Sequence, residues 1–163
     1  MKSIFLAILM FFAGLIVPAY CVIRSIEFRQ ECSGYLRQAA DANTVELASE
    51  RLGMAVNYIE EHEMTSGYTS VVWRTEDENV GYWYRNIKAC QAELEAAVDG
   101  TQLEKSNVLM KVRESLTDGE KLTIPHGISR FPYNTLFGIL RLVSYLLLAA
   151  GIVKFSVWYD EEF

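Results

Sequence analysis

Three cysteines and two histidines are the side chains of this chain best suited to metal binding or covalent chemistry. Cys21, Cys32 and Cys90 form no Cys-X-X-Cys pair and show no cysteine–histidine spacing typical of a zinc site. Cys90 falls on an apolar helical stripe, where a thiol packs as a small apolar group. A Cys32–Cys90 disulfide needs an oxidising compartment, and unless the chain kinks at Gly34, a continuous helix holds these residues about 20 Å apart. We therefore expect free thiols and no metal ion.

The run at residues 60–63 (EEHE) has the composition of a metal site but not its spacing. On a helix, only residues three or four apart converge, and those that converge with His62 include Tyr58 and Ile59, which are poor ligands. His126 stands in a predicted loop with no evident partner in the sequence. The sequence also contains no GxSxG, HExxH, phosphate-loop or GxGxxG motif. We expect a protein that is not an enzyme and needs no cofactor.

The charge of the chain bears on its partners. It has 15 Lys and Arg residues against 21 Asp and Glu residues, which gives a formal net charge of −6. A protein that binds nucleic acid through its backbone needs a basic face, so we expect no nucleic-acid partner. Hydrophobic residues make up 51% of the chain, which excludes a disordered acidic tail.

The strongest signal for binding lies between two predicted helices. Residues 65–74 (TSGYTSVVWR) exceed the usual helix–helix connection of about 2–8 residues, and they are rich in apolar and aromatic types. Trp, Tyr and Arg dominate binding hot spots, and the same types form cages for cations or apolar ligands. A hydrophobic cap that closes the bundle is the structural alternative. We predict a partner-binding surface at the distal tip of the bundle, made of Tyr68, Val72, Trp73, Arg74, Tyr82, Trp83 and Arg85.

Two apolar runs indicate an integral membrane protein in a lipid bilayer. Residues 3–23 contain no charge over 21 positions, and a bilayer core needs about 20 residues of helix. Residues 136–158 are interrupted only by Arg141 and Lys154, whose long side chains reach the interface by snorkelling. Pairing of Arg141 with an acidic group of another subunit is the alternative. We predict a transmembrane signal-anchor at 1–23, a second transmembrane helix at 132–159 and a short acidic tail at 160–163.

The start of the chain leaves two other interpretations open. A cleaved signal peptide would end near residues 19–21, and a lipoprotein would be lipidated at Cys21, although the bulky Tyr20 disfavours that. Basic residues on the two flanks of the first apolar run nearly balance. The signal-like start favours a bacterial inner-membrane protein with both termini in the cytoplasm and residues 24–131 as a periplasmic domain. A cytoplasmic domain is the alternative.

The middle of the chain, residues 24–131, is predicted to be a soluble helical bundle. Apolar residues spaced three and four apart from Val45 to Ile59 indicate a helix that ends near Met64. We expect it to run on from the membrane over residues 24–64, with Ser33-Gly34 as a place where it could break or kink. Such a helix would rise about 60 Å.

Two capping boxes indicate the helices that follow. Thr75 with Glu78 starts a helix that buries a stripe from Val80 to Val98, and Thr101 with Glu104 starts another that ends before Gly119. The predicted fold is all-α, with two transmembrane helices flanking a small antiparallel bundle of about three helices.

Two functions fit this layout. The first is an accessory or assembly subunit of a larger membrane complex, which binds a membrane-protein partner or a second copy of itself. The second is an extracytoplasmic ligand-sensing module. The order of helix, helical bundle and helix is similar in architecture to the sensory half of bacterial chemoreceptors, without a shared motif. Only residues 160–163 follow the second span, so a sensor of this kind would signal laterally to a partner membrane protein.

Overall fold

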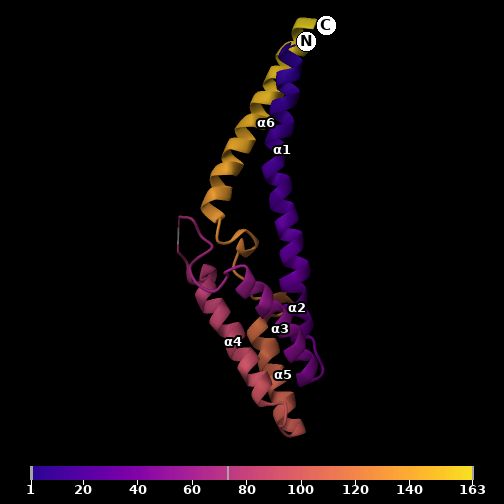
Figure 1. Cartoon of the computed structure of the whole chain (residues 1–163), viewed down its shortest axis with the longest axis vertical. Coiled ribbons are helices and arrows are strands. Elements are labelled where there is room, and N and C mark those ends of the chain that lie inside the picture. Colours follow the sequence, from indigo (N-terminus) through magenta and orange to yellow (C-terminus); the bar gives the residue numbers. More distant parts are fainter. Residues whose placement is uncertain (1, 73, 163) are drawn as a thin grey trace. The chain divides into compact units, whose positions relative to one another are not determined.

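The structure is a computed structural model that describes residues 2–72 and 74–162. The chain divides into two compact units, one of Met1–Ser25 with Tyr133–Phe163 and the other of Ile26–Pro132. The described residues are mostly helical, and their only sheet is a two-stranded hairpin (Figure 1). The all-α prediction is confirmed, with two long apolar helices at the ends of the chain and a helical region between them.

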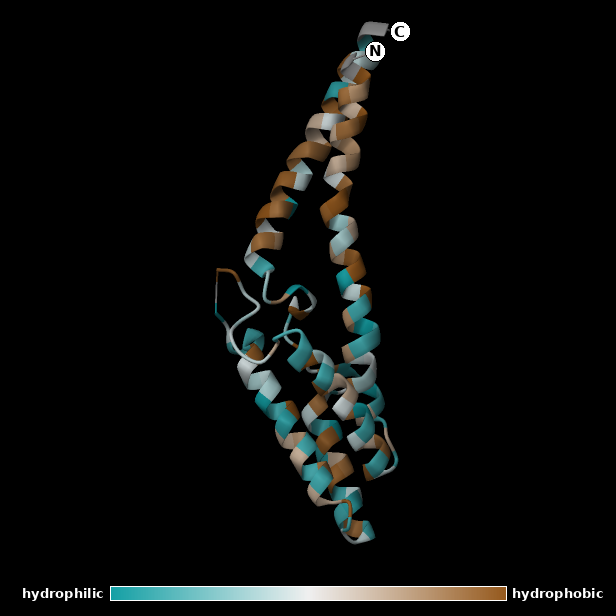
Figure 2. Ribbon diagram, viewed as in Figure 1, coloured by the Kyte–Doolittle hydropathy of each residue, from teal (hydrophilic) through white to brown (hydrophobic). Residues whose placement is uncertain are grey.

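The first unit pairs the apolar part of α1 (Lys2–Phe28) with α6 (Asn134–Glu162). Both helices are long and apolar enough to cross a bilayer (Figure 2). They pack through small residues, which let two backbones approach closely. A Cβ atom on Gly14 would lie 2.7 Å from Cγ of Leu148, and one on Gly151 would lie 3.1 Å from the carbonyl oxygen of Ala7. These contacts pair the helices in antiparallel order.

The second unit begins at Ile26 in the last turn of α1, which passes into a π-helical turn, η1 (Arg29–Ser33), and then into α2 (Gly34–Ala40). The prediction of an unbroken helix over residues 24–64 is wrong, because the chain turns at residues 41–44 and reverses. The Thr44 hydroxyl accepts a hydrogen bond from the Leu47 amide at 3.2 Å and starts α3 (Val45–Glu61). The Phe28 ring meets the Tyr58 ring at 6.0 Å, so α3 runs back along the preceding helix.

The rest of the bundle consists of α4 (Val80–Ala96) and α5 (Gln102–Leu116). The capping box predicted at Thr101 is present in full. The box predicted at Thr75 does not start α4, because a short 3-10 turn, η2 (Glu76–Glu78), stands there instead. Asn79 caps α4, because its side-chain oxygen accepts a hydrogen bond from the Tyr82 amide at 2.9 Å.

After α5 the chain forms a small hairpin and returns toward α6. Strands β1 (Thr117–Asp118) and β2 (Lys121–Leu122) pair antiparallel, and Gly119 between them has a positive φ of 60°. A 3-10 turn, η3 (Ile128–Arg130), follows. The guanidinium of Arg37 on α2 donates to the Glu120 carbonyl, which ties the hairpin to the bundle.

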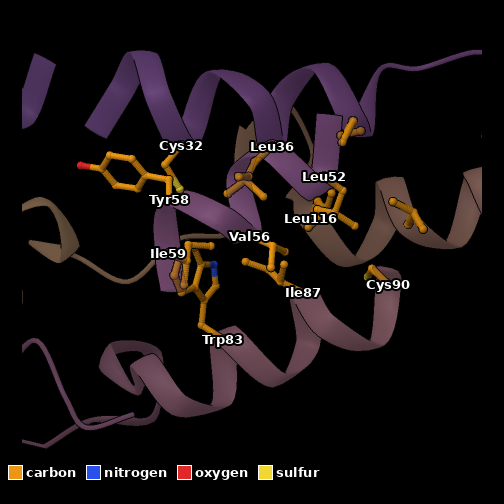
Figure 3. Packing of buried hydrophobic residues seen from close by; sticks show 14 of the residues in the cluster. Cys32, Leu36, Leu52, Val56, Tyr58, Ile59, Trp83, Ile87, Cys90 and Leu116 are labelled. Carbon is orange, nitrogen blue, oxygen red and sulfur yellow. The ribbon is translucent and has the colours of Figure 1, made fainter. Parts of the chain in front are cut away.

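Side chains from α2, α3, α4 and α5 form one apolar core (Figure 3). Its most deeply buried large side chains include Leu36, Leu52, Ile59, Ile87 and Leu94. The three cysteines are free and buried. The stripe predicted for α4 is buried from Val80 to Ala97, with Tyr84 partly buried, whereas Val98 is exposed. Position 98 falls in the turn after the helix, where the helical spacing no longer applies.

Candidate functional site

The aromatic segment singled out in the sequence belongs to the loop between α3 and α4, residues 62–79, which we call the α3–α4 loop. Its two arms are hydrogen-bonded to each other. The Thr69 amide donates to the Glu78 carbonyl at 3.0 Å, and the Val80 amide donates to the Gly67 carbonyl at 2.9 Å. The Asn79 amide group also donates to the Tyr68 hydroxyl at 3.3 Å. The base of the loop is therefore held against the start of α4.

This loop does not lie at the distal tip of the bundle, as the sequence had led us to expect. A Cβ atom on Gly67 would lie 3.4 Å from the Phe131 ring, and Phe131 stands next to Pro132, where the bundle unit ends. The loop lies at the end of the bundle where the chain enters and leaves, away from the turn between α4 and α5 (Figure 1). The reason is the turn at residues 41–44, which sends α3 back along α2.

The outer part of the loop presents apolar surface. Val71 is 54% exposed and Val72 is 71% exposed. The Arg74 guanidinium lies over the Tyr68 ring, 5.6 Å from its centroid, in a cation–π contact. Trp73, which we predicted to be part of the binding surface, lies outside the residues that the structure describes.

A second feature, which we call the α4 groove, lies on the first turns of α4. It has a volume of about 480 Å³ and runs between α4 with η2 on one side and the segment after β2 on the other. Tyr82 is exposed and forms part of its wall. The remaining lining residues are Glu76, Asp77, Asn79, Trp83, Asn86, Thr123 and Pro125.

Trp83 supports this groove from below. Its side chain is only 6% exposed, and its indole N–H donates to the Thr123 carbonyl at 3.0 Å. This bond joins the two walls of the groove across 40 residues of sequence. Trp83 therefore belongs to the core and the floor of the groove, whereas Tyr82 beside it faces outward.

The polar groups of the groove are suited to binding a basic group. Glu76 and Asp77 are exposed on one side, where their carboxylates attract cations. The Tyr82 ring offers an aromatic face for a guanidinium or ammonium group. Asn86 is oriented by a hydrogen bond from its amide nitrogen to the Ser115 carbonyl at 3.4 Å. The arrangement can bind a cation between carboxylates and an aromatic ring.

Three other predicted residues do not line this groove. Arg85 is exposed, and its guanidinium lies beside Gly81, against which the backbone of Ser66 also packs. It belongs with the base of the α3–α4 loop. Arg141 and Lys154 lie on α6 in the other unit, and both are partly exposed. The structure thus divides the described residues of the predicted partner surface between the α3–α4 loop and the α4 groove, and the two predicted intramembrane cations lie on α6.

The sequence did not indicate a polar cluster that joins α3 to α4. The Tyr84 hydroxyl donates to the Glu60 carboxylate at 2.6 Å, and Lys88 lies 3.5 Å from the same oxygen. The bond from Tyr84, with a smaller contribution from Lys88, holds the pKa of Glu60 below its usual value. Among the described residues, no three His, Cys, Asp or Glu side chains are grouped closely enough to hold a metal ion.

Comparison with known proteins adds no relative to this description. No protein-family model matches the chain, and no curated protein or solved structure matches it either.

Proposed function

We propose that this chain is a non-enzymatic integral membrane protein that serves as an accessory or assembly subunit of a larger membrane complex. The membrane part of the proposal rests on the outward faces of α1 and α6. Large apolar side chains such as Phe5, Phe12 and Leu146 point outward, while small residues fill the seam between the helices. A soluble protein buries such side chains, and exposed apolar surface of this extent marks a membrane or a protein partner.

We place both termini in the cytoplasm of a bacterium and the bundle outside its inner membrane. Two spans return the chain to the side on which it started. The apolar run with Lys2 before it resembles a signal-anchor in its order of charge and hydrophobicity.

The observation that supports partner binding is the α4 groove. It combines an exposed tyrosine, an oriented asparagine amide and two carboxylates around about 480 Å³. A basic side chain from a partner protein suits this set, because its charge meets Glu76 and Asp77 while its stem packs on Tyr82. The partner is a membrane protein of the same bilayer or a second copy of this chain.

The experiment is extraction of the full chain in mild detergent, followed by native sizing and mass spectrometry of the proteins that travel with it. We expect an assembly larger than the 18.6 kDa chain, containing one defined partner. The substitution Tyr82→Ala should reduce the amount of that partner recovered with the chain at least tenfold. Leu103→Ala is the matched control, since Leu103 is as exposed as Tyr82 or more so (71% against 64%) but lies on α5. Migration of the wild type as a lone monomer, or full retention of the partner by Tyr82→Ala, would overturn the proposal.

The volume of the groove also favours a second candidate function, an extracytoplasmic ligand-sensing module. Small-molecule sites occupy about 300–1,000 Å³, and the α4 groove falls within that range. Because of the carboxylates, the ligand would be a small organic cation. A thermal-shift screen of amines against the purified chain would show stabilisation that Tyr82→Ala abolishes, and the signal would pass laterally to a partner membrane protein.

A further inference from the structure

Two apolar side chains in the outer part of the α3–α4 loop remain exposed. Val71 and Val72 are adjacent, and both are more than half exposed. Figure 2 shows strongly hydrophobic colouring on part of the loop between α3 and α4. Behind them the loop is tied to α4 by backbone hydrogen bonds, so this apolar pair is presented on an ordered base.

The place of this loop within the bundle unit follows from helix geometry. The unit begins at Ile26, and Phe28 follows two residues later at the end of α1. Tyr58 packs on Phe28, and from there α3 runs only three residues more to Glu61, or about 4.5 Å. Helix α3 therefore ends near the point where the chain enters the bundle unit. The α3–α4 loop continues beyond the end of α3 (Figure 1).

The connection from the bundle to α6 also starts at the end that carries the loop. Gly67 at the base of the loop packs against Phe131, and only Pro132 and Tyr133 separate that residue from the start of α6. An extended chain spans at most about 3.6 Å per residue, so the base of the loop is held within a short tether of the second apolar helix. Both connections to the apolar helices therefore leave the bundle unit at the end that carries the α3–α4 loop.

We propose that the outer part of the α3–α4 loop inserts into the interfacial layer of the same bilayer that α1 and α6 cross. This inference rests on the proposed membrane integration. Val71 and Val72 enter the boundary between headgroups and acyl chains, and the guanidinium of Arg74, which lies over the Tyr68 ring, meets the lipid phosphates. Insertion stops at the interface, because an irregular loop in the hydrocarbon core would leave backbone polar groups without hydrogen bonds. The loop is a third membrane contact that fixes the bundle to the surface.

The test uses the full chain in phosphatidylcholine vesicles, with one introduced cysteine carrying an environment-sensitive fluorophore. Val72→Cys reports on the loop. Leu103→Cys is the matched control, because Leu103 and Val72 are both 71% exposed. The parent chain, whose own thiols are buried, gives the background labelling. We expect a blue-shifted emission at position 72 and at least threefold stronger quenching by lipids spin-labelled near the headgroup than at position 103.

A third label separates failure of this inference from failure of the proposed function. Phe12→Cys places the fluorophore on the outward face of α1, where Phe12 is exposed near the middle of the apolar run, and lipids spin-labelled deep in their acyl chains serve as its quencher. Quenching at position 12 with equal, weak quenching at 72 and 103 would overturn the loop insertion and leave membrane integration standing. Absence of quenching at all three positions would overturn both. Val71→Cys repeats the loop measurement, so a single poorly folded variant does not decide the result.

Discussion

At the scale of single residues, Glu60 provides a test of how α3 and α4 are joined. Its carboxylate accepts the Tyr84 hydroxyl at 2.6 Å, and this bond lowers the pKa of Glu60. We expect Tyr84→Phe to raise that pKa toward the usual value of about 4.5, with Lys88 preserving part of the shift. Carboxyl-carbon NMR titration of labelled glutamate in the full chain measures it. The pKa of Glu104 is lowered by bonds from Thr101, and it should stay unchanged as the internal control.

The sign of the pH effect on stability follows from the direction of that shift. A carboxylate with a lower pKa in the folded state stabilises the fold above its unfolded pKa, and this contribution disappears as the pH falls through the folded pKa. The stability difference between wild type and Tyr84→Phe should therefore be present at neutral pH and should shrink below about pH 4. A difference that stayed constant down to pH 2 would show that the two side chains are not coupled.

Residue patterns predicted which side chains face the core better than they predicted what those side chains bind. Helical spacing placed Trp83 and Cys90 on the buried stripe of α4, and both are buried. The same tryptophan was also assigned to the partner surface because of its residue type. Its actual partner is the Thr123 carbonyl, 40 residues away. No local pattern identifies that contact, because the hairpin after α5 brings Thr123 to α4.

At the scale of elements, two side chains near the start of α4, Asn79 and Thr75, differ in whether they cap the helix. Asn79 accepts the Tyr82 amide, whereas the Thr75 hydroxyl donates only to the Glu78 side chain on the surface. We expect Asn79→Ala to lower the free energy of unfolding by about 1 kcal/mol, because it leaves an amide of the first turn without its cap. Thr75→Ala should change it by less than about 0.5 kcal/mol. Urea unfolding of the bundle in mild detergent, followed by tryptophan fluorescence, measures both, and equal losses would contradict this assignment.

The elements show where sequence reasoning succeeds and where it stops. The box at Thr101 was predicted because both its hydrogen bonds are local, and the structure has both. The reversal after α2 was missed, although residues 41–44 (DANT) are polar and include Thr44, a good N-cap. The helical pattern on either side of this short turn concealed it. Ser33-Gly34, where a kink was expected, instead ends a π-helical turn and the helix continues.

The contact between α1 and α6 gives a second prediction at this scale. A side chain on Gly14 would collide with Leu148 and with the Ser144 carbonyl, 2.9 Å from the new Cβ atom. Gly14→Leu should therefore destabilise the helix pair by about 1–3 kcal/mol, lowering the apparent melting temperature in detergent by roughly 2–10 °C. Gly138→Leu is the matched control, because a Cβ atom on Gly138 meets nothing within 4 Å. Similar melting temperatures for the two variants would mean that the helices do not pack through Gly14.

At the scale of the whole molecule, one short turn decides where the binding candidates lie. If residues 24–64 formed a single helix, the aromatic loop would stand about 60 Å from the apolar run. Because α3 reverses at residues 41–44, the loop returns to the end where the chain joins its apolar helices. The residues of this loop were found from their composition. Their location required the long-range contact between Gly67 and Phe131, which no pattern in the sequence shows.

The sidedness of the molecule is the final prediction. Two spans place both termini on one side of a membrane, and we expect tags on the N-terminus and C-terminus to be protected in intact bacterial spheroplasts. An impermeant protease added outside should instead remove the bundle, residues 26–132. Cutting is expected first at exposed polar turns, such as residues 41–44. In lysed spheroplasts the tags should become accessible, which is the control. Accessible tags with a protected bundle would reverse the orientation, and one accessible tag would mean that only one of the two helices spans the membrane.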